Sequence, residues 1–425
     1  MPEQGLSGMS ASFSSAETGG ASAAPAWRRL ADPDRLYRWA TLLVLPAFVI
    51  WPGFKSEVFA IYAVLFAFQV WRNGYLRSGL EPWLLVGLLG LAASALDVRD
   101  AEVPRRVLQT ARVVCLPLMM CQFRPVPRLE RILAGGFSLL GLYGLGRLLF
   151  APIVTGYAQD RPYCFSDFFM HSSVIAVSGF LFFLVFFLRS ERPAARTFCG
   201  ANVLLFAALI LMHRVRGSYL ALLVLMPLIL AVECRRKALA GLAALALAGI
   251  VAAGTVHVLR PDLTAVAVGR VRSIGDRTDG SNRGRLVIWS RALEVFREHP
   301  VNGIGYRRFN REHVRLGSRE FEWSFWHAHG EYVSMLAETG LAGTLAWIVF
   351  KLGLLSVLFR HRRFPLGAFL FWLALAFELH SLVETYHYER TAYIYVYLLL
   401  GLGLNQLVPK TGAIRLTRAR GRVNA

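Results

Sequence analysis

Long apolar blocks alternate with short polar connections along the chain from residue 39 to residue 408. Most blocks are about 15–25 residues long, which is the length of helix that crosses a bilayer. The first two blocks are short enough to form a hairpin, and Pro117 interrupts the fourth, so whether the fourth crosses fully is left open. The pattern predicts about twelve spans, over residues 39–54, 57–71, 80–96, 107–122, 131–154, 167–188, 197–212, 217–233, 238–259, 331–359, 364–383 and 391–408.

The expected fold is therefore an all-α integral membrane protein of about 12 transmembrane helices with one long, partly helical loop. Residues 1–38 are expected to form a cytoplasmic disordered tail, because their first part is rich in Ala, Ser and Gly. The predicted membrane region comprises 39–259 and 331–408, separated by the loop 260–330. Residues 409–425 form a short basic tail.

Composition excludes several classes of protein. Hydrophobic residues make up 55% of the chain and charged residues only 17%, which excludes a soluble enzyme, a disordered protein and a disulfide scaffold. The net charge of +20 comes from 43 Arg and only 4 Lys. In a soluble protein this charge would suggest nucleic acid. In a membrane protein basic residues flank the cytoplasmic ends of helices, so no nucleic-acid partner is expected.

The basic residues also predict the orientation. With a cytoplasmic N-terminus, the five inner loops hold 14 basic residues and the five short outer loops hold eight, so both termini are expected in the cytoplasm. The loop 260–330 then lies outside, with 13 Arg, eight acidic residues and none of the five cysteines. Such a long loop translocates regardless of its charge. Its arginines therefore indicate a functional element.

The loop has a local pattern of its own. Residues 279–282 read Asp-Gly-Ser-Asn, which is a turn rich in helix-capping side chains. Apolar residues at helical spacing follow and predict an amphipathic helix over roughly 284–298. This helix ends at His299 and Pro300, and residues 302–305 (Asn-Gly-Ile-Gly) predict a tight turn.

Two pairs of arginines lie at predicted helix starts. Arg214 and Arg216 precede the eighth span, and Arg283 and Arg285 precede or begin the loop helix. A helix N-terminus favours anions, and a guanidinium group matches the oxygens of a phosphate. The two pairs predict a pyrophosphate clamp. The alternative is that these arginines extend to lipid headgroups at the membrane boundary.

A pair of histidines, His327 and His329, joins the loop to the tenth span. Either imidazole suits a general base, or is a hydrogen-bonded residue of the interface. An extended pair could also bind a metal, but no third ligand has suitable spacing. Glu338 lies within the apolar span and needs a partner there. Trp326 belongs to an aromatic run that predicts either an interfacial belt or sugar stacking.

Several motifs in order resemble the O-antigen ligase and O-antigen polymerase superfamily. They cover the last half of the chain, and the expected architecture extends the resemblance over its whole length. At position 330 this chain has glycine where the family commonly has asparagine. The motifs are Arg214–Ser218, Gly284-Arg285 with Trp289, His299–Gly305, His329–Tyr332 and Ala337–Gly343.

The resemblance implies a periplasmic, metal-independent and cofactor-free glycosyl transfer with inversion, in the bacterial inner membrane. The donor would be a glycan on undecaprenyl pyrophosphate and the acceptor a sugar hydroxyl of the lipid A–core. Arg216 and Arg285 would stabilise the pyrophosphate, and His329 would be the general base. Further substrate contacts are expected from Arg214, Arg283, His327, Trp326 and Glu338.

Two other functions stay open. A polymerase would take a second lipid-linked glycan as acceptor and often has two large Arg-rich outer loops, whereas this chain has one, which favours a ligase. A lipid or glycan transporter would place ionisable groups near the middle of broken helices. Apart from Glu338, Glu378 and Arg112, such groups are scarce.

Overall fold

The structure is a computed structural model, and it is predominantly α-helical, as the apolar pattern predicts. It describes residues 32–50, 56–96, 100–155, 165, 169–234, 236–259, 265, 268–269, 271–276, 278–310, 325, 327–388, 390–408 and 411–414. The elements are α2 (Pro33–Ile50), α3 (Ser56–Asn73), β1 (Tyr75–Arg77), α4 (Glu81–Ala93), α5 (Glu102–Val114), α6 (Leu116–Met120), α7 (Leu129–Thr155), α8 (Phe169–Arg189), α9 (Pro193–His213), α10 (Arg216–Glu233), α11 (Arg236–Leu259), α13 (Gly280–Glu298), α14 (Glu331–Arg360), α15 (Pro365–Ser381), α16 (Arg390–Leu407) and β2 (Thr411–Ile414).

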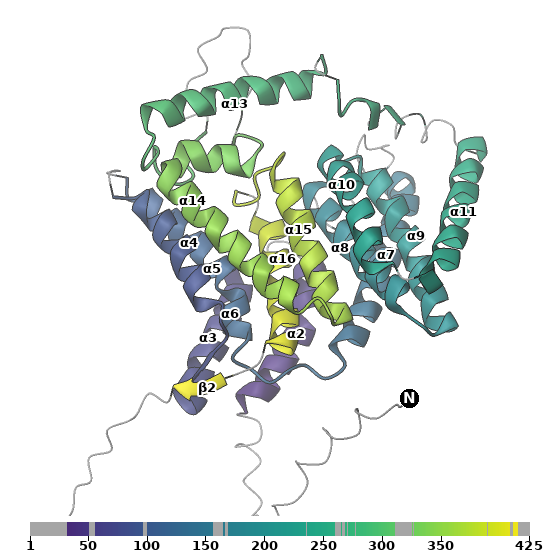
Figure 1. Ribbon diagram of the computed structural model, residues 1–425, viewed down its shortest axis with the longest axis horizontal. Coiled ribbons are helices and arrows are strands. Elements are labelled where there is room, and N and C mark those ends of the chain that lie inside the picture. Colours follow the sequence, from purple (N-terminus) through teal and green to yellow (C-terminus); the bar gives the residue numbers. More distant parts are fainter. Residues whose placement is uncertain are drawn as a thin grey trace, which may run out of the picture.

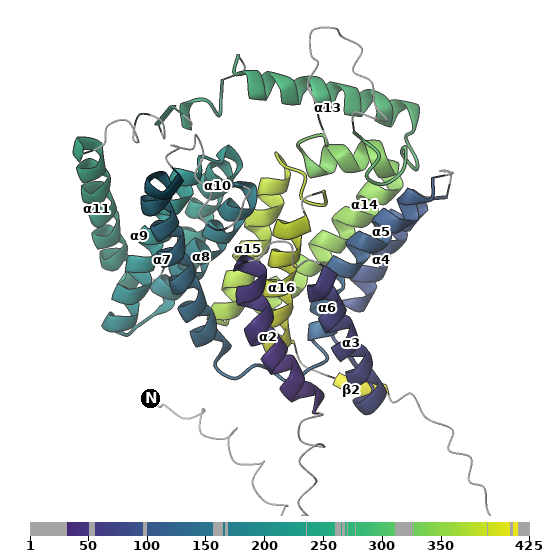
Figure 2. The ribbon, with the colours of Figure 1, turned by 180° about the vertical axis from the view of Figure 1, so that it is seen from behind.

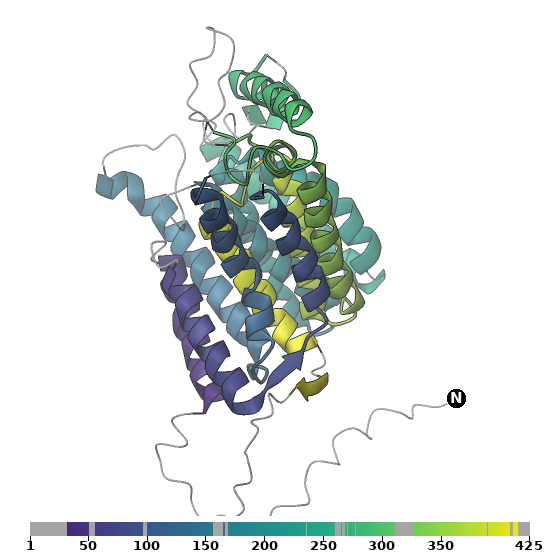
Figure 3. The same cartoon turned by 90° about the vertical axis from the view of Figure 1, so that its left-hand side faces the viewer.

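The long helices form a bundle, and α13 lies across one end of it, above the start of α14 (Figures 1 and 2). Figure 3 shows the same layer from the side. The start of α2 lies at the opposite end of the bundle (Figure 1), as does β2, which pairs antiparallel with β1. Within the described residues, the first and last elements therefore lie on the side away from α13.

Four helices of the described residues are long and apolar enough to cross a membrane, and the shorter apolar helices fall on other predicted spans. The number of twelve spans stays a prediction. The four long segments are Met170–Arg189, Pro193–His213, Arg216–Glu233 and Glu331–Arg360, and the shorter ones are Glu81–Ala93, Leu239–Val251, Pro365–Ser381 and Thr391–Leu407.

Two predicted elements differ from the observed ones. Helix α2 begins at Pro33, inside the segment assigned to the tail, because proline fits the first turn of a helix and the Asp32 side chain accepts a hydrogen bond from the amide of Asp34. The predicted fourth span is two helices, α5 and α6, which meet at Cys115. Pro117 lies in the first turn of α6, which explains why the apolar block does not continue as one helix.

Helix α8 lies in the centre of the bundle, with almost every side chain buried. Its rings pack against Phe137 of α7, Phe206 of α9 and Phe369 of α15. The helices α4 and α14, in contrast, approach each other closely at small residues. A methyl group on Gly90 of α4 would lie 2.3 Å from Cβ of Ala346 in α14, so only glycine permits this approach.

The helix α14 is kinked at Gly340, where φ is +61°. The segment that follows α13 enters the kink: Leu341 donates its amide to the carbonyl of Pro300, and Gly305 donates to that of Glu338. A Cβ on Gly340 would lie 2.2 Å from the carbonyl oxygen of Val301. The motifs at His299–Gly305 and Ala337–Gly343 are thus two halves of one backbone junction.

Candidate functional site

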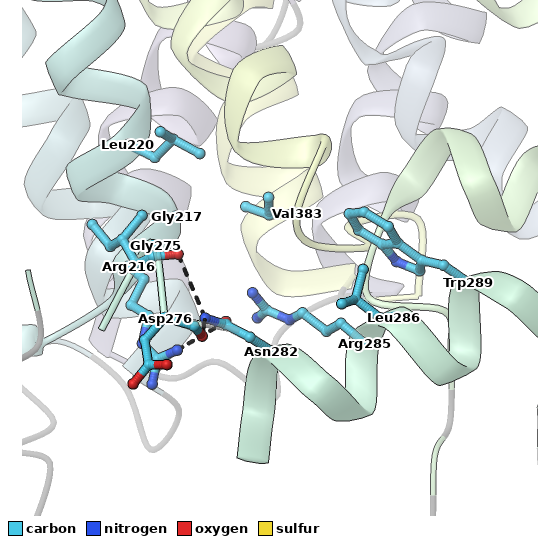
Figure 4. A pocket seen from close by; sticks show the side chains of 11 residues that line it. Arg216, Gly217, Leu220, Gly275, Asp276, Asn282, Arg285, Leu286, Trp289 and Val383 are labelled. Carbon is cyan, nitrogen blue, oxygen red and sulfur yellow. Dashed lines mark hydrogen bonds between the residues drawn. The ribbon is translucent and has the colours of Figure 1, made fainter. Parts of the chain in front are cut away.

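A cavity of about 280 Å³ lies between α13 and the end of the bundle. This volume is near the lower limit for small-ligand sites. Both arginines of the predicted clamp, Arg216 and Arg285, face this cavity (Figure 4). The lining residues are Arg216, Gly217, Leu220, Ile274, Gly275, Asp276, Asn282, Arg285, Leu286, Trp289 and Val383.

Arg216 is the first residue of α10, and two residues separate it from the end of α9. Its guanidinium donates to both carboxylate oxygens of Asp279, at 2.9 and 2.8 Å, and to Oδ1 of Asn282 at 2.9 Å. A Cβ on the next residue, Gly217, would lie 2.2 Å from the His380 ring. The start of α10 is therefore packed closely against α15, and Arg216 is held in place from both sides.

The carboxylate of Asp279 has two tasks. It caps α13 by accepting hydrogen bonds from the amides of Ser281 and Asn282, and it neutralises Arg216. The hydrogen bond from Arg216 holds the pKa of Asp279 below its usual value, so this carboxylate is charged at neutral pH. An anion that binds Arg216 must therefore compete with an internal carboxylate.

Arg285 lies in the second turn of α13 and extends across the cavity towards Val383 (Figure 4). Its Nη2 donates to Oε1 of Glu384 at 2.8 Å. Glu384 belongs to the connection between α15 and α16. Burial acts to raise the pKa of Glu384, but the interaction with His329 and the charge of Arg285 outweigh it and lower that pKa. Glu384 is therefore an anion that accepts a hydrogen bond from Arg285 and faces His329.

His329 is the second side chain that faces Glu384. Its Nδ1 lies 3.6 Å from Oε2 of this carboxylate, so one side chain joins His329 to Arg285. The His329 side chain is 37% exposed, whereas His327 is buried. The amide of His329 donates to Nδ1 of His327 at 3.2 Å, and the backbone of His329 is left-handed with φ of 51°. His329 is the accessible member of the pair.

The neighbours of His329 are fixed by two hydrogen bonds. Nε1 of Trp289 in α13 donates to the carbonyl of Ala328 at 2.8 Å, and the amide of Gly330 donates to Oγ1 of Thr385 at 2.9 Å. A Cβ on Gly330 would lie 3.1 Å from the carbonyl oxygen of Leu382. This close approach favours glycine over asparagine at position 330.

Glu338 finds its partners outside the cavity. It is fully buried and accepts hydrogen bonds from the amides of Arg307 and Phe309, at 2.9 and 3.3 Å. The Nε2 atom of His387 lies 3.3 Å from it, and the hydroxyl of Tyr388 donates to it. The expected partner of Glu338 is thus a set of amides and side chains. Its contacts hold the loop, and it does not line the cavity.

The third potential metal ligand comes from a distant part of the chain. One ligand atom each of His327, His329 and Glu384 lies within 4.8 Å of the others. These donors suit a divalent transition metal. Arg285 donates to the same carboxylate at 2.8 Å, and its positive charge opposes a cation at this position. The cluster therefore fits a histidine base beside a carboxylate at least as well as a metal centre.

Three other predicted residues lie elsewhere. Arg214 is the C-cap of α9 in a left-handed conformation, with φ of 56°, and it is not among the cavity-lining residues. Arg283 is exposed on α13 and does not line the cavity either. Trp326 lies outside the described residues. Neither Asp279 nor Glu384 was expected at the site. The sequence does contain one indication of both: each is an acidic residue in a connection between helices, where an arginine-rich segment needs a counter-charge.

The fold and the site define a helical protein with apolar helices long enough to cross a membrane. Two arginines line a cavity at one end of its bundle, and Glu384 connects one of them to His329. Residues 200–348 match the family model described as O-antigen ligase. This match confirms the resemblance found in the motifs and supports the O-antigen ligase/polymerase superfamily. It includes Arg216, Arg285 and His329. No curated protein matches the chain.

Proposed function

We propose that the protein is an O-antigen ligase that transfers a glycan from undecaprenyl pyrophosphate to the lipid A–core. The observation that carries this proposal is that Arg216 and Arg285 line one cavity, while His329 faces the same Glu384 carboxylate that Arg285 binds. All three residues belong to the segment that matches the family. The reaction would take place at the periplasmic face of the inner membrane. Both termini would then be cytoplasmic, since the first and last described elements lie opposite α13.

The donor's pyrophosphate would bind between the two arginines. A polyprenyl pyrophosphate is already a stable leaving group, so it needs neutralisation of its charge more than a strong acid. Arg216 and Arg285 come from different helices, and each can present a planar pair of N–H donors to a phosphate. The apolar lining residues Leu220, Leu286 and Val383 would contact the adjoining part of the lipid.

His329 would accept the proton of the acceptor hydroxyl. Its Nδ1 faces Glu384, which leaves Nε2 as the nitrogen that takes the proton. The acceptor oxygen forms a bond to the anomeric carbon while the bond from that carbon to the pyrophosphate oxygen breaks. The electron pair of this bond stays with the pyrophosphate, and His329 releases the proton to water. Attack opposite the leaving group inverts the anomeric carbon.

Glu384 would position both groups. Its carboxylate contacts Arg285 through Oε1 and His329 through Oε2, so it fixes the distance between the leaving-group site and the base. We propose that no metal takes part, because the charge that a metal would supply is available from the two arginines. Arg214, Arg283, His327 and Trp326 would then contribute, if at all, to the outer part of the substrate site.

The direct test is reconstitution. Purified protein, lipid-linked glycan and lipid A–core are mixed without added metal, and the products are separated on a gel. A ligase yields a glycan–lipid A–core conjugate. An O-antigen polymerase, the alternative within the superfamily, lengthens the lipid-linked glycan instead, and a transporter forms no new glycosidic bond. Either of these two outcomes would reject the ligase assignment.

A further inference from the structure

The helix α5 exposes a column of polar side chains beside the bundle. Arg105, Gln109 and Arg112 follow one another at the spacing that places residues on one helix face. The opposite face is buried, with Val103 and Val113 in the core. Arg105 lies at the end of α5 nearest α13, whereas Arg112 lies nearly two turns further into the bundle.

Arg112 borders a second cavity, of about 60 Å³, between α3, α5 and α16. Its polar lining consists of Arg112, Gln109 and Ser56, and its apolar lining includes Phe59 and Ile394. Ser56 is the first residue of α3, and Ile394 lies in the second turn of α16. Ser56 lies at the predicted outer connection between the first two spans, so the predicted topology would put this cavity near the outer boundary of the membrane.

The charge of Arg112 has no counterpart in this cavity. The guanidinium lies 5.6 Å from the centre of the Phe59 ring. In the part of the chain that the structure describes, no carboxylate oxygen is within 4 Å of it. An arginine next to apolar side chains at a membrane boundary is stabilised by a counter-charge. Phosphate supplies this charge in a geometry that a guanidinium group matches.

We propose that this cavity binds the phosphate group of an anionic phospholipid, with Arg112 and Gln109 as donors and the apolar lining in contact with an acyl chain. The cavity is too small for a glycan. It presents three polar side chains, which is enough for one phosphate. This site goes beyond the proposed transferase function and does not depend on it.

The bound phospholipid would support the loop next to the catalytic site. Gln109 accepts a hydrogen bond from Nη1 of Arg307 at 3.4 Å, and Arg106 donates to the carbonyl of Arg307 at 2.7 Å. The hydroxyls of Thr110 and Tyr306 lie 2.9 Å apart. The helix α5 is therefore joined to the segment that Glu338 anchors.

Native mass spectrometry of the full-length protein tests the proposal. The detergent-purified protein is titrated with phosphatidylglycerol, which is anionic, and separately with phosphatidylcholine, which is zwitterionic. The wild type should retain phosphatidylglycerol in preference. Arg112→Gln should weaken this binding about tenfold, as expected for loss of a charge-assisted hydrogen bond. Arg105→Gln, on the same face but outside the cavity, is the matched control and should bind like the wild type.

A second variant keeps the test valid if Arg112→Gln does not fold. Ser56→Glu places a negative charge beside the phosphate, while an acidic residue in the first turn of α3 is favourable for the helix. It should weaken phosphatidylglycerol binding without lowering the thermal unfolding temperature. Equal retention by wild type, Arg112→Gln and Ser56→Glu would overturn the proposal. So would selective retention of lipid A–core in place of phosphatidylglycerol. Neither result would bear on the transferase, because no turnover is measured.

Discussion

Arg216 and Arg285 each donate to an internal carboxylate, and both face the same cavity. We expect Arg216→Ala and Arg285→Ala each to lower transfer by about 10²-fold or more, the usual cost of removing a donor to developing charge. Lys replacements should restore activity only in part, because lysine lacks the planar fork. Conjugate formation with purified variants measures this. Full activity of either Ala variant would remove that residue from the site.

Substitution of His327 and His329 distinguishes a general base from a metal centre. Loss of a positioned base costs about 10²–10⁴-fold in rate, so His329→Ala should be severely impaired and the buried His327→Ala much less so. A chelator should leave transfer unchanged. If His327, His329 and Glu384 held a required metal, both substitutions would lower the transfer rate to a similar extent. A divalent ion would then restore activity after chelation. An active His329→Ala enzyme would refute the base assignment.

Asp279 competes with the ligand for Arg216. Because its folded pKa is lowered, this ion pair is present at neutral pH and is lost as the pH falls through the lowered pKa. Asp279→Asn removes the competing charge and keeps a good helix cap, so inorganic pyrophosphate should bind several-fold more tightly, on the order of 1 kcal/mol. Titration calorimetry at pH 7 measures this.

The matched control for Asp279 is Asp276→Asn. Asp276 also lines the cavity, but its carboxylate accepts hydrogen bonds from Thr278 and not from Arg216. This variant should bind pyrophosphate with nearly the affinity of the wild type. Unchanged or weaker binding by Asp279→Asn would show that the carboxylate assists the anion site instead of competing with it.

At the scale of elements, a backbone junction joins the kink of α14 to the segment after α13. Gly340→Ala would place a methyl group 2.2 Å from the carbonyl of Val301, at a backbone conformation that alanine disfavours by about 1–2 kcal/mol. We expect a clear fall in the unfolding temperature. Gly135→Ala in α7 has nothing within 4 Å of the new methyl group and serves as control. Equal unfolding temperatures of both variants would contradict the close packing of Gly340 against Val301.

The sequence predicts those parts of the site that depend on local signals. Arg216 and Arg285 can be identified because each lies near a predicted helix start, and Asp279 lies in the predicted capping turn. Glu384 cannot be predicted in this way, since it is 99 residues away from Arg285. Only the packing of α15 against α14, and of α14 against α13, brings the two together. The motifs around Val301 and Gly340 can be recognised only as separate motifs. Their contact requires the kink of α14 at Gly340, which the apolar pattern does not reveal.

At the scale of the whole molecule, the proposed reaction requires α13 and the cavity to face the periplasm. The structure places the start of α2 and β2 opposite α13 (Figure 1), and the basic residues predict which side is cytoplasmic. Reporter fusions at residue 300 should therefore read periplasmic, and fusions at residues 236 and 362 cytoplasmic. Two reporters with opposite requirements, alkaline phosphatase and green fluorescent protein, control for misfolded fusions. A cytoplasmic signal at residue 300 would separate the cavity from a periplasmic glycan donor and overturn the ligase assignment, even if all the contacts around Arg216 and His329 were correct.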